Sequence, residues 1–138
     1  MTTVSYSYEF PYGYYAERRV PQIPVRISNP SLPGRAVDVD VHFDSGAERS
    51  LFNGDFASAL EIDLFGGPDQ PYESLSGNRI SGRLHGIKIF HPQLGEFPLV
   101  VGFSTQPIHR NILGRDFFNL IQIGFRERYL SFLIDPKP

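Results

Sequence analysis

The sequence predicts a mainly β domain: a small closed or semi-closed barrel with one or two short helices. Three observations predict this class. Apolar and polar residues alternate in several segments, as in strands with one buried face. The 13 glycines and 12 prolines are spread along the chain, where they form turns. With 138 residues, the chain suits a single domain. A barrel protects the many strand edges.

The first half of the chain contains the clearest strand pattern. Alternation predicts strands over residues 4–10 and 23–27. A stronger strand pattern covers residues 37–43, and its alternation extends to Asp44. One face carries Val37, Val39, Val41 and Phe43, and the other carries Asp38, Asp40, His42 and Asp44. Residues 53–60 are the best helix candidate, with Asn53 as the cap.

The second half continues the pattern of strands and turns. Strands are expected around residues 80–84, 87–90 and 97–103, separated by glycine or proline turns. A second short helix is expected after Gly114, and a last strand over residues 129–134. We interpret residues 1–138 as one domain, which divides into an aromatic amino-terminal extension (1–19), a core (20–134) and a tail (135–138).

The composition argues against several function classes. Fifteen acidic and 13 basic residues give a net charge of -2, without the basic excess of a nucleic-acid binder. The absence of cysteine excludes disulfides, thiolate metal sites and a cysteine nucleophile. No apolar run approaches the roughly 20 residues of a membrane helix, and no secretory signal opens the chain. We therefore expect a cytoplasmic protein without a cofactor, nucleic-acid partner or membrane partner.

Histidine does not indicate a metal site either. The four histidines lack metal-ligand spacing; they are His42, His85, His91 and His109. His42 lies two residues before Asp44 on the polar face of its strand. We interpret it as a surface histidine, with a position near a functional site as the alternative.

Two short segments carry the chemistry of the chain. The strongest strand ends in Asp44-Ser45-Gly46-Ala47, where an aspartate enters a turn of small residues that leave it accessible. Such a turn also occurs in ordinary loops, where the aspartate only caps the turn. The second segment is residues 111–116, with two apolar residues before Gly114-Arg115-Asp116.

Together the two segments resemble the motifs of the retropepsin-like aspartic proteases. Residues 43–47 match the family's Asp-Thr/Ser-Gly-Ala, and residues 112–116 match its apolar-apolar-Gly-Arg-Asp/Asn. The resemblance spans about residues 20–134 and indicates a bacterial or cellular member of the family. It implies an acid-protease-like barrel that forms a two-fold homodimer.

The resemblance also implies a mechanism. Members of the family hydrolyse peptide bonds with a water held by two aspartates that share one proton. The chain has a single Asp-Ser-Gly, so the second catalytic aspartate would be Asp44 of another copy. The Ser45 hydroxyl would hydrogen-bond across the same two-fold axis. The implied function is a homodimeric aspartic endopeptidase acting on peptides or proteins.

Other site residues are carried over from the family. Arg115, with Gly114 and Asp116, would brace the active-site loop through a charged pair with Glu48, although an ordinary helix-start arginine is equally compatible. A flap that closes over substrate is expected within residues 72–84. Its tip would contain Ser76, Gly77, Asn78, Arg79 and Ile80. An ordinary hairpin turn is the alternative for this segment.

Three questions stay open at the level of sequence. The domain can be a protease, or a non-catalytic retropepsin-like module that binds peptides or dimerises. The strand-like segments 4–10 and 129–134 can pair between subunits or within one chain. Pocket residues are expected after Ala47, in the flap and over residues 103–111. The aromatic amino-terminal cluster is interpreted as edge strand and core; it comprises Tyr6, Tyr8, Phe10, Tyr12, Tyr14 and Tyr15.

Overall fold

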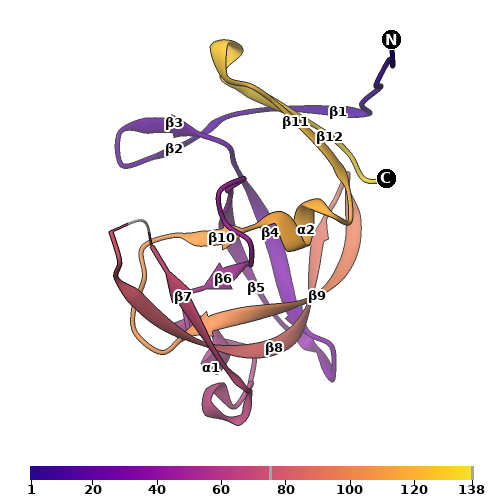
Figure 1. Ribbon diagram of the computed structural model, residues 1–138. Helices are drawn as coiled ribbons and strands as arrows, with labels where there is room; N and C mark the ends of the chain where they lie inside the picture. Colours follow the sequence, from indigo (N-terminus) through magenta and orange to yellow (C-terminus); the bar gives the residue numbers. More distant parts are fainter. Residues whose placement is uncertain (75, 138) are drawn as a thin grey trace.

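The main sheet closes on itself into a barrel (Figure 1). A computed structural model describes residues 1–74 and 76–137 of the chain. The sheet contains, in spatial order, β4 (Gln22–Asn29), β5 (Leu32–Phe43), β10 (Asn111–Leu113), β6 (Leu51–Phe52), β9 (Gly95–Ser104) and β8 (Arg79–His91). Because β8 also pairs with β4, the ring is complete and the predicted barrel is confirmed.

The alternating pattern of the sequence explains the interior of the barrel. On β5, Val39, Val41 and Phe43 are buried, whereas Asp38 and Asp40 are exposed. Antiparallel pairing with β4 places equally apolar residues opposite them, since Ile23 lies beside Val41. Both strands thus turn one apolar face inward, as side-chain alternation requires.

A long hairpin leaves the barrel on one side. β7 (Asp69–Glu73) pairs with the first part of β8, from Asp69↔Arg83 to Glu73↔Arg79, while the last part of β8 pairs with β4. β8 runs unbroken through the segments expected as two strands. The predicted break is wrong because Gly86 keeps its place in the ladder, opposite Val100.

The predicted short helices are present at α1 (Asp55–Ala59) and α2 (Arg115–Phe118). Single 3-10 turns follow at η1 (Leu64–Gly66) and η2 (Glu127–Tyr129). Asn53 precedes the α1 cap, which is Gly54, yet its Oδ1 accepts the Asp55 N–H at 3.1 Å. Within the described ranges, no helix is long and apolar enough to cross a membrane.

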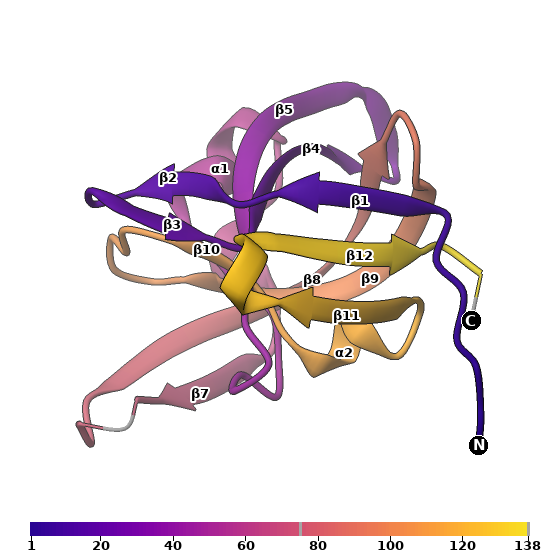
Figure 2. The same ribbon diagram turned by 90° about the horizontal axis from the view of Figure 1, so that it is seen from above.

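The two ends of the chain form a second, smaller sheet of β1 (Tyr8–Pro11), β12 (Ser131–Asp135) and β11 (Gln122–Arg126) (Figure 2). The terminal segments therefore pair within one chain, with Tyr8 opposite Ile134. β1 starts later than predicted. β12 also starts late because η2 precedes it and Leu130 adopts a left-handed backbone conformation (φ 51°).

The amino-terminal extension contains a hairpin that the sequence did not reveal. β2 (Gly13–Tyr15) pairs with β3 (Arg18–Val20), and Ala16 and Glu17 form the turn with φ of 48° and 64°. Two-residue turns of this hand usually carry asparagine and glycine. Neither asparagine nor glycine is present here, so the sequence of this turn did not indicate a hairpin.

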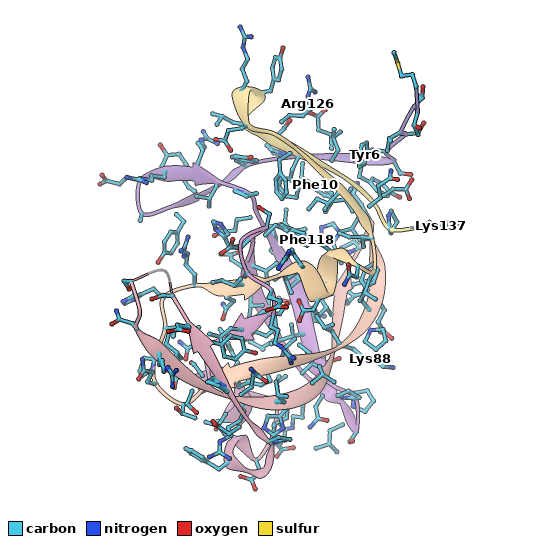
Figure 3. All side chains as sticks on the ribbon, viewed as in Figure 1. Tyr6, Phe10, Lys88, Phe118, Arg126 and Lys137 are labelled. Atoms are coloured by element: carbon cyan, nitrogen blue, oxygen red, sulfur yellow. The ribbon has the colours of Figure 1, made fainter. Side chains whose placement is uncertain are left out.

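Aromatic packing joins the terminal sheet to the barrel. The Phe132 ring lies 5.6 Å from that of Phe10 and 5.1 Å from that of Phe43. Phe118 of α2 packs on Phe43 from another side, at 6.2 Å. Figure 3 shows Phe10 on the barrel side of the terminal sheet, with Phe118 on α2 below it. Since Phe43 is the last residue of β5, this cluster fixes the point where that strand ends.

Candidate functional site

Asp44 lies half-buried where β5 ends. Its N–H donates to the Leu113 carbonyl of β10 at 3.0 Å, so the neighbouring parallel strand fixes its backbone. Its Oδ1 accepts the Gly46 N–H at 2.8 Å, and its carbonyl accepts the Ala47 N–H at 3.1 Å. The following turn therefore holds the carboxylate in one orientation.

The small residues of the turn keep Asp44 accessible. Ser45 and Gly46 are exposed, and Ala47 is half-buried. A Cβ atom on Gly46 would lie 3.2 Å from Asp44 Oδ1, closer than nearly all such contacts. Glycine therefore suits the close approach of carboxylate and backbone.

The second motif packs directly against this turn. The Arg115 N–H donates to the Ala47 carbonyl at 2.8 Å. A Cβ atom on Gly114 would lie 2.7 Å from that carbonyl oxygen and 3.0 Å from the Arg49 carbonyl carbon, so a larger residue does not fit. The structure thus brings together the two segments that the sequence singled out.

Asp116 joins the two segments through Ser50, which is completely buried. Its carboxylate accepts the Ser50 N–H at 3.0 Å and the Ser50 hydroxyl at 2.7 Å. The same hydroxyl oxygen accepts the Gly114 N–H at 3.0 Å. Sequence reasoning did not identify Ser50, because a serine between Arg49 and an apolar pair matches no motif.

Tyr72 connects this network to the hairpin outside the barrel. Its hydroxyl donates to the Ser50 carbonyl at 3.0 Å. Burial, together with the nearby Asp116 charge, raises the pKa of Tyr72 to about 12, so the hydroxyl stays a donor at physiological pH. Its ring lies against Gly82 and Gly102, where a Cβ atom would come within 2.6 Å and 2.3 Å of Tyr72 atoms.

The expected charged pair between Glu48 and Arg115 does not form in this structure. Four ion pairs occur among residues 1–74 and 76–137, and none includes either side chain. Both residues are exposed beside a hollow of about 500 Å³ that Arg49 and Asp116 also line. Asp116 and Ser50 connect the segments instead, together with the backbone bond from the Asp116 N–H to the Glu48 carbonyl (3.3 Å).

The segment expected to form the flap is a hairpin. The Ser74 N–H donates to the Asn78 carbonyl at 3.0 Å, and Gly77 has a φ of 84°, which favours glycine. The tip residues Ser76 to Arg79 are exposed, and Ile80 is half-buried. Residue 75 of the expected flap and residue 138 of the expected tail lie outside the described residues.

The interpretation of His42 as a surface histidine is wrong. The side chain is half-buried, and its Nδ1 atom is buried without a hydrogen-bond partner. Burial lowers the pKa of His42 and the Arg110 charge lowers it further, whereas Asp44 opposes the shift. Pairing of β5 with β10 explains the burial, because Ile112 lies directly beside His42.

A cleft of about 830 Å³ opens next to this strand pair. Its floor contains Leu51 and Ile112, and Ile112 is the strand neighbour of His42. The expected flap hairpin contributes Ile80 and the loop before β10 contributes residues 106–110, whereas Glu48 and Arg49, which follow Ala47, line the other hollow. The β2–β3 hairpin supplies an unexpected wall, made of Tyr15, Ala16, Arg18 and Val20. Asp44 is not one of the lining residues; its backbone bonds to Leu113, the residue after Ile112 of the floor.

In the part of the chain that the structure describes, no three histidine, aspartate or glutamate side chains come close enough to share a metal ion.

Comparisons with solved structures identify the fold. A retropepsin-like aspartic protease from Rickettsia conorii superposes with a TM-score of 0.61 at 14% identity, covering 97% of this chain and 96% of that one. EIAV protease in complex with an inhibitor gives a TM-score of 0.54 at 17% identity, covering 78% and 92%. No protein-family model and no curated protein matches the chain by sequence. The chain has the retropepsin-like fold, mainly β with two short helices.

Proposed function

We propose that the protein is a homodimeric aspartic endopeptidase in which Asp44 of each subunit contributes to one active site. The observation that carries the proposal is the geometry of Asp44. It follows a buried strand, and a turn of small residues orients its carboxylate. The Gly114–Asp116 segment braces this turn within a retropepsin-like fold. Both similar structures are described as proteases, which supports the same activity here.

The chemistry requires a second carboxylate. Two aspartates at about 3 Å share one proton, because both cannot be ionised at that distance. The ionised member takes a proton from a water molecule while the protonated member polarises the peptide carbonyl. Since the chain has one Asp-Ser-Gly, a two-fold axis next to Asp44 would supply the partner's equivalent side chain.

The surroundings of Asp44 are compatible with such an axis. Ser45 and Gly46 are exposed in the single chain, as residues at an unoccupied interface must be. Under this proposal the Ser45 hydroxyl bonds across the axis, and Glu48 and Arg115 contribute to the contact. The β7–β8 hairpin acts as the flap over a peptide in the cleft, with its tip formed by residues 76–80.

The test compares two aspartate substitutions, one directly after β5 and one within it. Asp44→Asn should abolish cleavage of a peptide library at every pH tested, while the folded state is kept, because asparagine has nearly the same shape. Asp40→Asn, four residues earlier on the same face and exposed, is the matched control and should retain activity.

The outcome also decides between a protease and the alternative module. If Asp44→Asn cleaves the library at the wild-type rate, Asp44 has no catalytic role and the proposal is wrong. If the wild type dimerises and binds peptides without cleaving any at pH values from acid to neutral, the domain is a non-catalytic peptide-binding or dimerisation module.

A further inference from the structure

The charged side chains that line the cleft are two arginines. Arg18 comes from β3, and Arg110 comes from the loop before β10. No aspartate or glutamate is among the lining residues. The remaining walls are mainly apolar, with Leu51, Ile80 and Ile112. A ligand that fits this cleft should therefore combine apolar groups with a negative charge.

The two arginines are not neutralised by the chain itself. Neither belongs to any of the four ion pairs among residues 1–74 and 76–137, and both are exposed. The Arg110 guanidinium lies over the Tyr15 ring, 5.4 Å from its centroid, which holds it at the cleft wall. The acidic residues Asp38 and Asp40 line a separate hollow with Arg110 and His109.

The turn that positions Arg18 is strained. Ala16 and Glu17 both have positive φ, a region that residues other than glycine seldom occupy. The two-residue turn brings Arg18 opposite Tyr15 in the β2–β3 ladder, so both side chains reach the cleft. Strained backbone is retained where the surrounding structure requires it, often at binding sites. The hairpin, the loop before β10 and the β7–β8 tip lie on one side of the molecule in both views (Figures 1 and 2).

We propose that this cleft is a specificity subsite for an acidic side chain of the substrate peptide, with Arg18 and Arg110 as its counter-charges. The inference rests on the proposed function, because it identifies the ligand as a substrate. An aspartate or glutamate side chain brings two acceptor oxygens to guanidinium donors, while its neighbours in the peptide contact the apolar floor. The preference should weaken as salt is added, since the arginines are exposed.

The experiment measures binding separately from cleavage. Two random-sequence peptide libraries differ only in one fixed residue, Glu in the first and Gln in the second. Fluorescence anisotropy follows their binding to Asp44→Asn protein, which cannot cleave them under the proposed mechanism. We expect the Glu library to bind about fivefold more tightly, a preference of the size that partly exposed charge pairs give.

Substitution then assigns the preference to residues. The double variant Arg18→Gln and Arg110→Gln should bind the two libraries equally. Arg128→Gln, an exposed arginine on η2 outside the cleft, should keep the preference. The inference is overturned if the protein that keeps both arginines binds the two libraries equally. It is also overturned if the double variant still prefers the Glu library as strongly.

Cleavage of the same libraries by wild-type protein separates this inference from the proposed function. Cleavage of both libraries at equal kcat/KM overturns the acidic subsite and leaves the protease standing. Preferential binding of the Glu library without any cleavage overturns the protease, and the cleft is then a binding site for acidic peptides.

Discussion

Ser50 and Asp116 are joined by two hydrogen bonds across 66 residues of sequence. The serine follows the turn that contains Asp44, and the aspartate lies in the first turn of α2. Because the Ser50 hydroxyl oxygen also accepts the Gly114 N–H, one buried serine ties its own segment to the segment 114–116 at two points. The position of the candidate catalytic loop therefore depends on a polar network inside the barrel wall.

Removing this hydroxyl should destabilise the fold. In Ser50→Ala the half-buried Asp116 carboxylate loses one donor and the buried Gly114 N–H loses its acceptor. We expect the free energy of unfolding to fall by about 2 kcal/mol, as measured by urea denaturation. Ser58→Ala, an exposed serine on α1, should change it little. Equal stability of the two variants would show that the network does not support the fold.

The Tyr72 side chain lies so close to Gly82 and Gly102 that neither position has room for a Cβ atom. Gly102→Ala places a methyl group against the ring and should cost about 1–3 kcal/mol. The cost should shrink in a Tyr72→Ala background, which a double-mutant cycle measures. Gly86→Ala is the matched control, because a Cβ atom there has no neighbour within 4 Å. Additive effects of the Gly102 and Tyr72 substitutions would contradict this contact.

His42 should make stability depend on pH. Its folded-state pKa lies below the ordinary 6.5, so the unfolded chain binds more protons in that window. Stability is therefore lost as pH falls through 6.5 toward the folded-state pKa. His42→Leu should reduce this loss between about pH 7 and about pH 5, as measured by urea denaturation at several pH values.

Other groups titrate in ways that this experiment can distinguish. Burial also lowers the pKa of His91, so the variant should keep part of the slope. A hydrogen bond from Ser131 lowers the pKa of Glu9 from 4.5, and one from Arg26 lowers the pKa of Asp38 from 3.8. These two carboxyl groups therefore change stability only at more acidic pH. The exposed His109→Leu is the control. An unchanged slope in His42→Leu would contradict the role assigned to its burial.

Ser45 is predicted to act on dimerisation rather than folding. Its side chain is exposed in the single chain. Under the proposed function Ser45→Ala removes a hydrogen bond across the two-fold axis and should raise the dimer dissociation constant about tenfold. Analytical ultracentrifugation measures this constant. An unchanged constant would mean that the hydroxyl does not cross the interface.

Much of the fold could be predicted from sequence because its determinants are local. Alternation on β5 identified the buried face, and the small residues after Asp44 identified its turn. Gly114 was found because only glycine tolerates the approach of Ala47, which makes the motif recognisable. The closed barrel followed from the number of strands, and the structure confirms it.

The features that were missed depend on contacts distant in sequence. Ser50 looks like any serine until Asp116 and Gly114 surround it. His42 alternates with apolar residues as a surface side chain would, but Ile112 of β10 and Gln22 of β4 flank it in the sheet. The β2–β3 turn uses Ala16 and Glu17 in place of the usual turn residues. None of these positions carries a local signal of its tertiary partner.

The central claim is that one active site uses Asp44 from two chains, and subunit mixing tests it most directly. Wild-type protein is mixed with increasing fractions of Asp44→Asn at constant total concentration, allowed to exchange subunits, and assayed for peptide cleavage. If mixed dimers are inactive, activity falls with the square of the wild-type fraction. Activity proportional to the wild-type fraction itself would mean that each chain works alone, and would contradict the shared site.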